Sequence, residues 1–307
     1  MKMTSMKMTI KDKEKALETF FKNHKKILIA FSGGADSSLL AAAGAAAAEH
    51  AADTDSIILA VTVKTELISD AEIENARSVA DEIGISHLII GKKMLNIPEI
   101  ENNQKDRCYA CKKELLTTLM EYAAENDYEA VLEGTNFSDK LMSDAGTVPR
   151  PGFSFILEQK EIQSKLSKAN YSGPILITPL LDFEITKEDV REMLKRKKIS
   201  TANKPSMSCL ATRFSYETKL DPALLKTIDA AEKMTKEIGA KQIRIRVHTD
   251  SAGRNIARIE VGADEGKFFF DKKNQKAVSD MISFLKQNGF SYVTADLEGF
   301  RSGSMDI

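Results

Sequence analysis

The sequence predicts an α/β fold, in which a parallel sheet covered by helices is followed by a smaller α+β domain. In the first two thirds, short apolar runs alternate with stretches of strong helix formers, a pattern typical of parallel strands joined by helices. In the last third, apolar and polar residues alternate one by one, as in strands buried on one face. The 307 residues suit about two domains of ~150 residues, which we place at 10–204 and 205–307.

The expected elements of the first domain follow in a regular order. A helix at 69–83 is indicated by Ser69 as N-cap, Glu72 as its capping-box partner and Gly84 as its end, and Thr186 caps a later helix. Residues 137–172 show no clear pattern, and we expect this region to include a long loop. The predicted strands are 25–31, 56–63, 87–91, 129–136 and 175–182, and the predicted helices are 36–52, 69–83, 109–126 and 187–197.

The second domain predicts the order α-β-β-α-β. A helix at 222–238 ends before Gly239, the strands QIRIRVHT and NIARIEVG follow, and a helix at 274–287 precedes a last strand at 291–298. Because side chains alternate between the faces of a strand, Arg244 and Arg246 project from one face. We expect that face to be exposed.

Charge and hydropathy exclude several classes of protein. Lys and Arg number 44 and Asp and Glu 45, a net charge of -1, so a general nucleic-acid binder, with its strong basic excess, is not expected. The longest apolar stretch, residues 39–48, is far shorter than the ~20 residues of a membrane helix. Nothing at the start resembles a secretory signal. We expect a cytoplasmic protein with reduced thiols and no membrane partner.

The segment Phe31-Ser-Gly-Gly-Ala-Asp-Ser-Ser38 lies where a buried strand passes into a helix. Two glycines allow a tight turn and close approach of a ligand, and the free N–H groups of the helix start attract an anion. The segment contains neither a Walker Gly-Lys-Ser/Thr nor GxGxxG. Val61 and the turn Gly134-Thr135-Asn136, with Asp139 just beyond, fall at the carboxyl ends of strands, where parallel sheets bind ligands. These features predict a phosphate site.

Three cysteines form the second notable feature. Cys108 and Cys111 are spaced Cys-x-x-Cys at the start of a predicted helix, and Cys209 lies in PSMSCLATRF. Basic neighbours and a helix N-terminus favour thiolates. Three interpretations remain open. They are a structural zinc site, which needs a fourth ligand, unrelated thiols of which one is reactive, and an iron-sulfur cluster with three thiolates and one open iron.

The motif SGGxDSS after a first strand resembles the PP-loop of the ATP pyrophosphatase superfamily. The resemblance implies an adenine nucleotide alpha hydrolase-like domain that splits ATP between its α and β phosphates. The loop would hold the leaving pyrophosphate, and Asp36 would help to hold Mg²⁺. The expected ATP-binding residues are Ala30, Ser32, Gly33, Gly34, Asp36, Ser37, Ser38, Val61, Gly134, Thr135, Asn136 and Asp139.

The whole set of motifs is more specific. SGGADSS, RCYACK, EGTN, SCLATRF, RIRVH, ARIE and LEGFRSGS together resemble the LarE family of ATP-dependent sulfur transferases, which mature the nickel-pincer cofactor of lactate racemase. The resemblance implies adenylation of a carboxylate of pyridinium-3,5-biscarboxylate mononucleotide, followed by displacement of AMP by sulfur. Members with all three cysteines are thought to hold a 4Fe–4S cluster, so Cys108, Cys111 and Cys209 would be its ligands.

The resemblance also implies roles for charged residues. Arg213 would neutralise the phosphate beside the sulfur at Cys209, which makes Cys209, Arg213 and Asp36 the expected catalytic residues. Glu232 would hold metal or substrate. The substrate and its phosphate would be bound by Lys112, Arg213, Glu232, Arg244, Arg246, Arg258 and Glu260.

Other functions stay open at this point. A tRNA thiolase of the same superfamily can use a similar cluster, but the net charge of -1 weighs against an RNA-binding face. A zinc-stabilised nucleotide-binding module without sulfur chemistry is the third hypothesis. For the sulfur transferase we expect an external sulfide or sulfur donor, and the family resemblance suggests a homo-oligomer.

Overall fold

The structure is a computed structural model that describes residues 8–49, 57–145, 151–166, 173–205, 208–301 and 303–305. The predicted end of a helix near Ala52 and the start of a strand at Ser56 lie outside these ranges, as do residues 146–150 and 167–172 of the expected loop.

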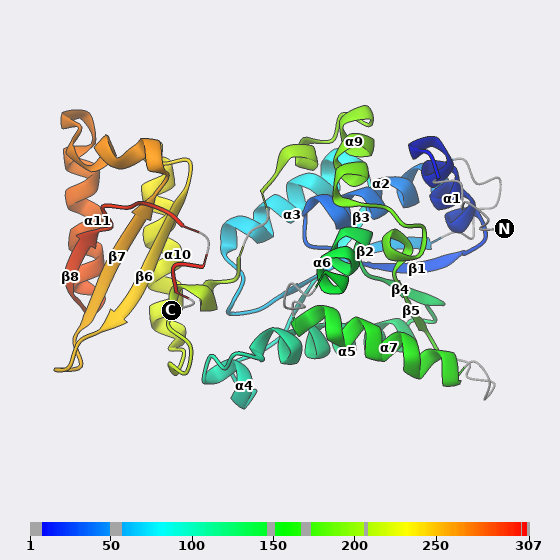
Figure 1. The fold of residues 1–307 in the computed structure, drawn as a ribbon, viewed down its shortest axis with the longest axis horizontal. Helices are drawn as coiled ribbons and strands as arrows, with labels where there is room; N and C mark the ends of the chain where they lie inside the picture. Colours follow the sequence, from blue (N-terminus) through cyan, green and yellow to red (C-terminus); the bar gives the residue numbers. More distant parts are fainter. Residues whose placement is uncertain are drawn as a thin grey trace. The chain divides into compact units, whose positions relative to one another are not determined.

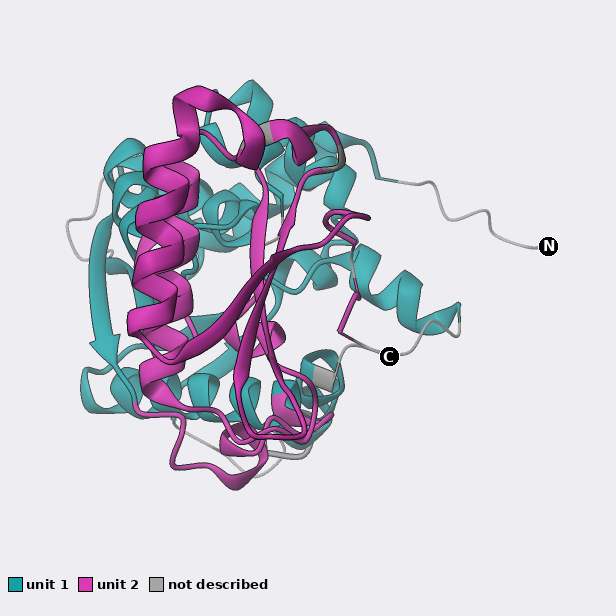
Figure 2. Ribbon diagram, turned by 90° about the vertical axis from the view of Figure 1, so that its left-hand side faces the viewer, with its two compact units in different colours: residues 1–64, 72–92, 108–206 teal, residues 65–71, 93–107, 207–307 magenta. Residues whose placement is uncertain are grey.

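The chain divides into two compact units (Figure 2). Unit 1 comprises residues 1–64, 72–92 and 108–206, and unit 2 comprises residues 65–71, 93–107 and 207–307. Two short segments from the first third of the sequence therefore pack with the last third. Sequence order does not reveal such an exchange, because the contacts that cause it are long-range.

Unit 1 contains a five-stranded, fully parallel sheet in the order β3-β2-β1-β4-β5 (Figure 1). This confirms the predicted parallel α/β architecture. Strand order reverses direction between β1 and β4, which makes the carboxyl ends of these two strands the topological switch point of the sheet. The strands are β1 (Lys26–Ala30), β2 (Ile57–Lys64), β3 (Ser86–Gly91), β4 (Ala130–Leu132) and β5 (Ile175–Ile177).

Helices cover both faces of this sheet (Figure 1). Alternation along the strands divides the core in two. Ile27 and Ile29 pack against one set of helices and Leu28 against the other. The first set is α1 (Ile10–Lys22), α2 (Ala35–Glu49), α3 (Asp70–Ile83) and α9 (Lys187–Arg196), and the second is α5 (Arg107–Glu125) and α7 (Pro151–Leu166).

Helix α2 is built almost wholly from small residues, ADSSLLAAAGAAAAE. Alanine is the strongest helix former, and small side chains let the helix backbone approach its neighbours closely. A Cβ added at Gly44 would lie 3.0 Å from Ile58 Cγ2 and 3.1 Å from Phe21 Cε1. The helix is therefore packed tightly between β2 and α1.

The structure corrects two sequence predictions in unit 1. The expected loop at 137–172 contains α6 (Phe137–Asp144) and α7 (Pro151–Leu166), and α6 begins at a capping box formed by Asn136 and Asp139. The strand expected at 175–182 ends at Ile177, and Pro179 opens the short helix α8 (Pro179–Asp182). The predicted Thr186 cap of α9 is confirmed, with Asp189 completing its capping box.

Unit 2 contains the predicted α-β-β-α-β order. Strands β6 and β7 pair antiparallel and β7 and β8 pair parallel. Helix α10 ends before Gly239, which has φ 111°. No helix of the described ranges is long and apolar enough to cross a membrane. The main elements are α4 (Pro98–Glu101), η3 (Leu210–Arg213), α10 (Pro222–Glu237), β6 (Ile243–Thr249), β7 (Asn255–Val261), α11 (Gln275–Gln287) and β8 (Phe290–Ala295).

Candidate functional site

The turn between β1 and α2 has the shape that a phosphate group requires. Gly33 has φ 63°, a conformation that glycine adopts without strain. A Cβ at this position would lie 2.7 Å from Asn75 Nδ2 and 2.8 Å from Ala76 Cα. Asn75 Nδ2 also donates to the Gly33 carbonyl at 3.0 Å. Helix α3 thus fixes the turn from behind and leaves room only for glycine.

The serines of the turn form a local hydrogen-bonded network. Ser37 Oγ donates to the Gly34 carbonyl and accepts from Ser32 N–H, each at 3.2 Å. Ser38 Oγ is buried and has no hydrogen-bond partner in the part of the chain that the structure describes. Because a buried hydroxyl without a partner costs free energy, Ser38 fits a loop that is completed by a bound anion.

The ends of β1 and β4 meet at the switch point. A Cβ added at Gly134 would lie 3.2 Å from Asp36 Cβ and 3.3 Å from Ser37 N. Asn136 Nδ2 donates to Asp36 Oδ1 at 3.2 Å. The structure therefore brings the expected residues of the first turn together with those of the Gly134-Thr135-Asn136 turn, at the edge where open α/β sheets bind ligands.

Asp36 is the acidic centre of this arrangement. Lys187 Nζ lies 2.5 Å from Asp36 Oδ2. Burial raises the pKa of Asp36, although Lys187 and Asn136 favour its ionised form. Asp139 adds a second negative charge nearby, while its carboxylate caps α6 by accepting from Asn136 N–H at 3.1 Å. A half-buried carboxylate beside a phosphate loop fits a Mg²⁺ ligand.

The structure adds two lysines to which the sequence analysis assigned no role in the site. Lys187 lies at the first position of α9, and Lys204 Nζ lies 2.9 Å from Glu72 Oε2 and 3.5 Å from the Gly33 carbonyl. Lys187 lies 151 residues from its partner Asp36 in the sequence, so no local pattern links them. Of the other expected ATP-binding residues, Val61 has its side chain in the core and its carbonyl accepts from Phe31 N–H.

A buried ion pair joins β4 to the first turns of α5. Lys112 Nζ contacts Glu133 Oε1, and Glu133 Oε2 accepts from Thr135 N–H at 2.8 Å. Burial disfavours the charge of Glu133, but Lys112 and Thr135 outweigh it and lower its pKa. Lys112, which was expected among the phosphate ligands, therefore forms an ion pair with Glu133 in this structure. The sequence analysis assigned no role to Glu133.

The three cysteines come from both units. Cys108 and Cys111 lie on the first turns of α5 in unit 1, and Cys209 precedes η3 in unit 2. Cys108 is exposed and the other two are half-buried. Cysteine thiolates are the usual protein ligands of iron-sulfur clusters, so the chemistry of these three residues is compatible with the predicted cluster. In the part of the chain that the structure describes, no three His, Cys, Asp or Glu side chains form a metal-binding group.

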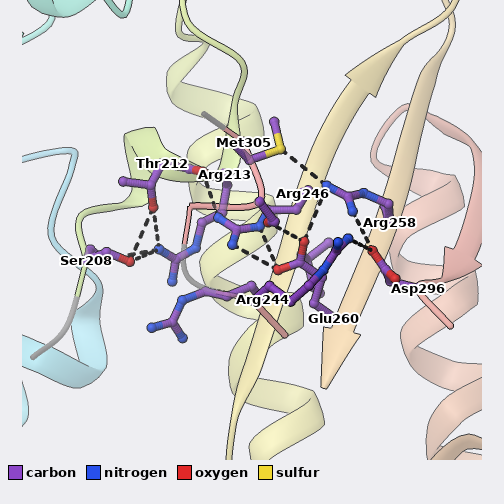
Figure 3. Close-up of polar contacts among 12 residues, drawn as sticks. Ser208, Thr212, Arg213, Arg244, Arg246, Arg258, Glu260, Asp296 and Met305 are labelled. Carbon is purple, nitrogen blue, oxygen red and sulfur yellow. Dashed lines mark hydrogen bonds and ion pairs between the residues drawn. The ribbon is translucent and has the colours of Figure 1, made fainter. Parts of the chain in front are cut away.

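In unit 2, Arg213 holds the segment around Cys209 (Figure 3). Its Nε and Nη2 donate to the two carboxylate oxygens of Glu232, each at 2.9 Å. Its Nη1 lies 3.2 Å from the Cys209 carbonyl and within 3.1 Å of oxygens of Ser208 and Thr212. Arg213 and Glu232 are almost fully buried. The structure thus engages Arg213 with protein groups rather than leaving it open to a phosphate, and it pairs Glu232 with Arg213.

A second buried network lies on the same unit (Figure 3). Glu260 accepts from Arg246 Nε at 2.9 Å, lies 3.3 Å from Arg258 Nη2, and accepts from Ser304 Oγ at 2.6 Å. Arg258 also pairs with Asp296. The expected exposed arginine face is therefore wrong, because Arg244 and Arg246 are 6% and 4% exposed. Period-two alternation could not show that the C-terminal segment covers this face.

Arg244 differs from the other three arginines. Its Nη1 donates to the Ile243 carbonyl at 2.7 Å, and its guanidinium lies 5.4 Å from the Phe300 ring centroid. Its Nε is buried and has no hydrogen-bond partner among the described residues. Burial, together with nearby Arg213, lowers the pKa of Arg244. Among the residues that the structure describes, ion pairs link Arg213, Arg246 and Arg258 to carboxylates, whereas none is found for Arg244.

The phosphate turn defines the chain as a PP-loop protein, and its second unit contains a buried cluster of arginines and carboxylates. The asparagine synthase family matches residues 14–170, the region that contains the phosphate turn and the Gly134-Thr135-Asn136 turn. The match supports an ATP-utilising enzyme.

Three relatives that match almost the whole chain show which family of PP-loop proteins it belongs to. The pyridinium-3,5-bisthiocarboxylic acid mononucleotide synthase of Lactiplantibacillus plantarum is 31% identical over 97% of this chain and 95% of its own length. An uncharacterized protein of Methanocaldococcus jannaschii is 31% identical over 98% and 100% of the two chains, and one of Synechocystis sp. is 29% identical over 97% and 98%. The chain belongs to the LarE family of ATP-utilising, sulfur-transferring enzymes.

Proposed function

We propose that the chain converts a carboxylate of pyridinium-3,5-biscarboxylate mononucleotide into a thiocarboxylate for the nickel-pincer cofactor. The carboxylate oxygen attacks the α phosphorus of ATP, and the bond to the β-phosphate oxygen breaks to release pyrophosphate. A sulfur nucleophile then attacks the acyl carbon, and the carbon–oxygen bond to AMP breaks. Atoms and charge balance without an added oxidant or reductant.

The phosphate turn supports the first step. The turn at Gly33, completed by Ser37 and Ser38, fits the pyrophosphate that leaves. Asp36 would hold Mg²⁺, which neutralises charge that develops on the phosphates. We also propose that Lys187 moves its charge from Asp36 to the phosphates when Mg²⁺ and ATP bind. Residues 10–204 would then carry out adenylation, and residues 205–307 would bind substrate and form the contacts of a homo-oligomer.

The environment of Arg244 is the main support for an anionic mononucleotide as the substrate. Arg244 has a buried guanidinium in the unit that contains Cys209, and among the described residues its Nε has no hydrogen-bond partner and no carboxylate forms an ion pair with it. A buried cation of this kind is stabilised by an anionic ligand. The phosphate and carboxylate groups of the mononucleotide have that chemistry. Arg246 and Arg258 would support the site through Glu260, while Arg213 and Glu232 would hold the Cys209 segment.

The cysteines would supply the sulfur chemistry. When bound by Cys108, Cys111 and Cys209, a 4Fe–4S cluster would leave one iron without a protein ligand and carry a sulfide there. An external sulfide or sulfur donor would replenish that sulfur. Cys209 would then survive each turnover intact.

The test is anaerobic reconstitution with iron and sulfide, followed by incubation with ATP, Mg²⁺ and the dicarboxylate mononucleotide. We expect pyrophosphate and AMP to form in step with the thiocarboxylate, and mass spectrometry to show an unchanged Cys209. Protein that stays colourless and iron-free contradicts the cluster. A Cys209 that has lost the elements of hydrogen sulfide shows a sacrificial route instead.

A further inference from the structure

Within unit 2, a buried asparagine ties together the two peptide segments that adjoin the cysteines. Asn103 has no exposed surface. Its Nδ2 lies 2.8 Å from the Ser215 carbonyl, 3.3 Å from that of Phe214 and 3.4 Å from that of Ala211. These three carbonyls belong to the segment that directly follows Cys209. The side chain of Asn103 therefore holds the chain at the end of η3.

Backbone and aromatic contacts continue this connection. The Asn103 carbonyl accepts from Glu217 N–H at 3.2 Å, and the Glu101 carbonyl accepts from Leu220 N–H at 2.7 Å. The Arg107 guanidinium lies 4.5 Å from the Tyr216 ring centroid, a distance suited to a cation–π contact. Arg107 is joined by a peptide bond to Cys108. The segment that ends at Cys108 is thus docked on the segment that leaves Cys209.

The Cys209 side of this connection is held firmly. Leu210 N–H donates to the Leu67 carbonyl at 2.8 Å. The Cys209 carbonyl lies 2.8 Å from Thr212 Oγ1 and 3.2 Å from Arg213 Nη1. Asn103 reaches the other end of the same turn, so the short helix is fixed on both sides.

Asparagine suits this position for two chemical reasons. Its amide presents two N–H donors to a group of carbonyl oxygens, whereas a carboxylate there would meet only acceptors. Its φ of 51° lies in the left-handed region, which asparagine tolerates better than most residues. Its Oδ1 has no hydrogen-bond partner, so the donor side of the amide makes the connection.

We propose that Asn103 is a positioning residue that fixes the Cys209 segment against residues 101–107 of the same unit, and so sets the position of the Cys209 thiol. The inference rests on the proposed function for the role of that thiol in sulfur transfer. Whether the Asn103 amide holds the Cys209 segment in place does not depend on the proposed function, and the reactivity of the Cys209 thiol tests it.

The first test compares the alkylation rate of Cys209 by iodoacetamide, followed by peptide mass spectrometry, in metal-free full-length variants. Asn103→Gly removes the amide but keeps the left-handed backbone. We expect its Cys209 to react about tenfold faster, because loss of the Asn103 hydrogen bonds favours local opening of the Cys209 segment. Asn102→Ala is the matched control, since the Asn102 amide donates to the Pro98 carbonyl. Its Cys209 should react as in the wild type.

The second test separates the sulfur site from the nucleotide site. After reconstitution, Asn103→Gly should retain several-fold less iron against a chelator and show a weaker cluster absorbance, while ATP–pyrophosphate exchange stays within twofold of wild type. Equal Cys209 alkylation rates in Asn103→Gly and the wild type overturn the proposal. A wild type that takes up no iron instead contradicts the cluster, and the alkylation rates still decide the role of Asn103. Asn103→Asp, which replaces the N–H donors by carboxylate oxygens, should raise the Cys209 alkylation rate in the same direction, and if it fails to fold, Asn103→Gly carries the comparison.

Discussion

The buried ion pair between Arg213 and Glu232 allows a sharp test of what holds unit 2 together. Their side chains are 2% and 5% exposed, and two bonds of 2.9 Å join them. Glu232→Gln keeps the shape and still accepts from Ile245 N–H, whose bond to Oε1 is 2.9 Å, but it removes the negative charge. The substitution therefore leaves the Arg213 cation buried without its counter-charge.

The expected loss follows from that geometry. Breaking a buried ion pair by removing one partner costs about 3–5 kcal/mol, and the retained hydrogen bonds place Glu232→Gln near the lower end. Against a total unfolding free energy of about 5–15 kcal/mol, this loss is large. Urea unfolding followed by circular dichroism measures it. A double-mutant cycle with Arg213→Met then isolates the coupling between the two side chains.

An exposed pair provides the control. Arg77 and Glu74 lie 3.6 Å apart and are 55% and 74% exposed, so Glu74→Gln should cost about 0–1 kcal/mol. The reasoning fails if Glu232→Gln lowers the free energy of unfolding no more than Glu74→Gln does, or if the coupling energy between Arg213 and Glu232 is near zero. Either result would mean that the buried pair does not stabilise unit 2.

Three further predictions concern the site itself. Lys187→Ala should slow ATP–pyrophosphate exchange about a hundredfold, because it removes a positive charge from Asp36 and the leaving phosphates. Arg244→Gln should raise the KM for the mononucleotide about tenfold or more, because it removes the proposed charge-assisted hydrogen bond from the guanidinium to an anionic group of the substrate. Steady-state kinetics measures this KM and the exchange rate of Lys187→Ala. Burial opposes the charge of Glu133, yet Lys112 and Thr135 lower its pKa. Its stabilising contribution is therefore complete above the ordinary pKa of 4.5 and is lost as the pH falls, so Glu133→Gln should weaken the acid dependence of the urea midpoint.

Each of these predictions has an opposing result. Unchanged exchange in Lys187→Ala would mean that this lysine serves only the fold. An unchanged KM in Arg244→Gln, with a folded protein, would place the anion elsewhere. The same acid dependence in Glu133→Gln and wild type would mean that other carboxylates cause it.

The sequence predicted features that depend on neighbouring residues. The turn at Gly33, the Thr186 cap and the parallel strands all follow from short-range patterns, and the structure agrees with them. The partners of Asp36 and Arg213 were not predictable in this way, because Lys187 and Glu232 reach them through tertiary packing.

Two sequence predictions were wrong because local patterns do not reveal long-range packing. Arg244 and Arg246 were expected on an exposed face because their strand alternates, but alternation reveals which residues share a face and not what covers it. The helices α6 and α7 were not predicted because residues 137–172 show no clear periodic pattern, although Pro151 is well suited to the first turn of a helix.

The small side chains of helix α2 also bear on how the nucleotide binds. With Gly44 packed against Ile58 and Phe21, the helix has little freedom to slide or tilt. The phosphate loop at its start is thus pre-organised, and binding loses little conformational entropy there. Any closure around ATP must come from side chains outside α2, such as Lys187. We therefore expect the backbone of the phosphate loop to stay fixed when ATP binds, and the side chains of Lys187 and Lys204 to rearrange around it.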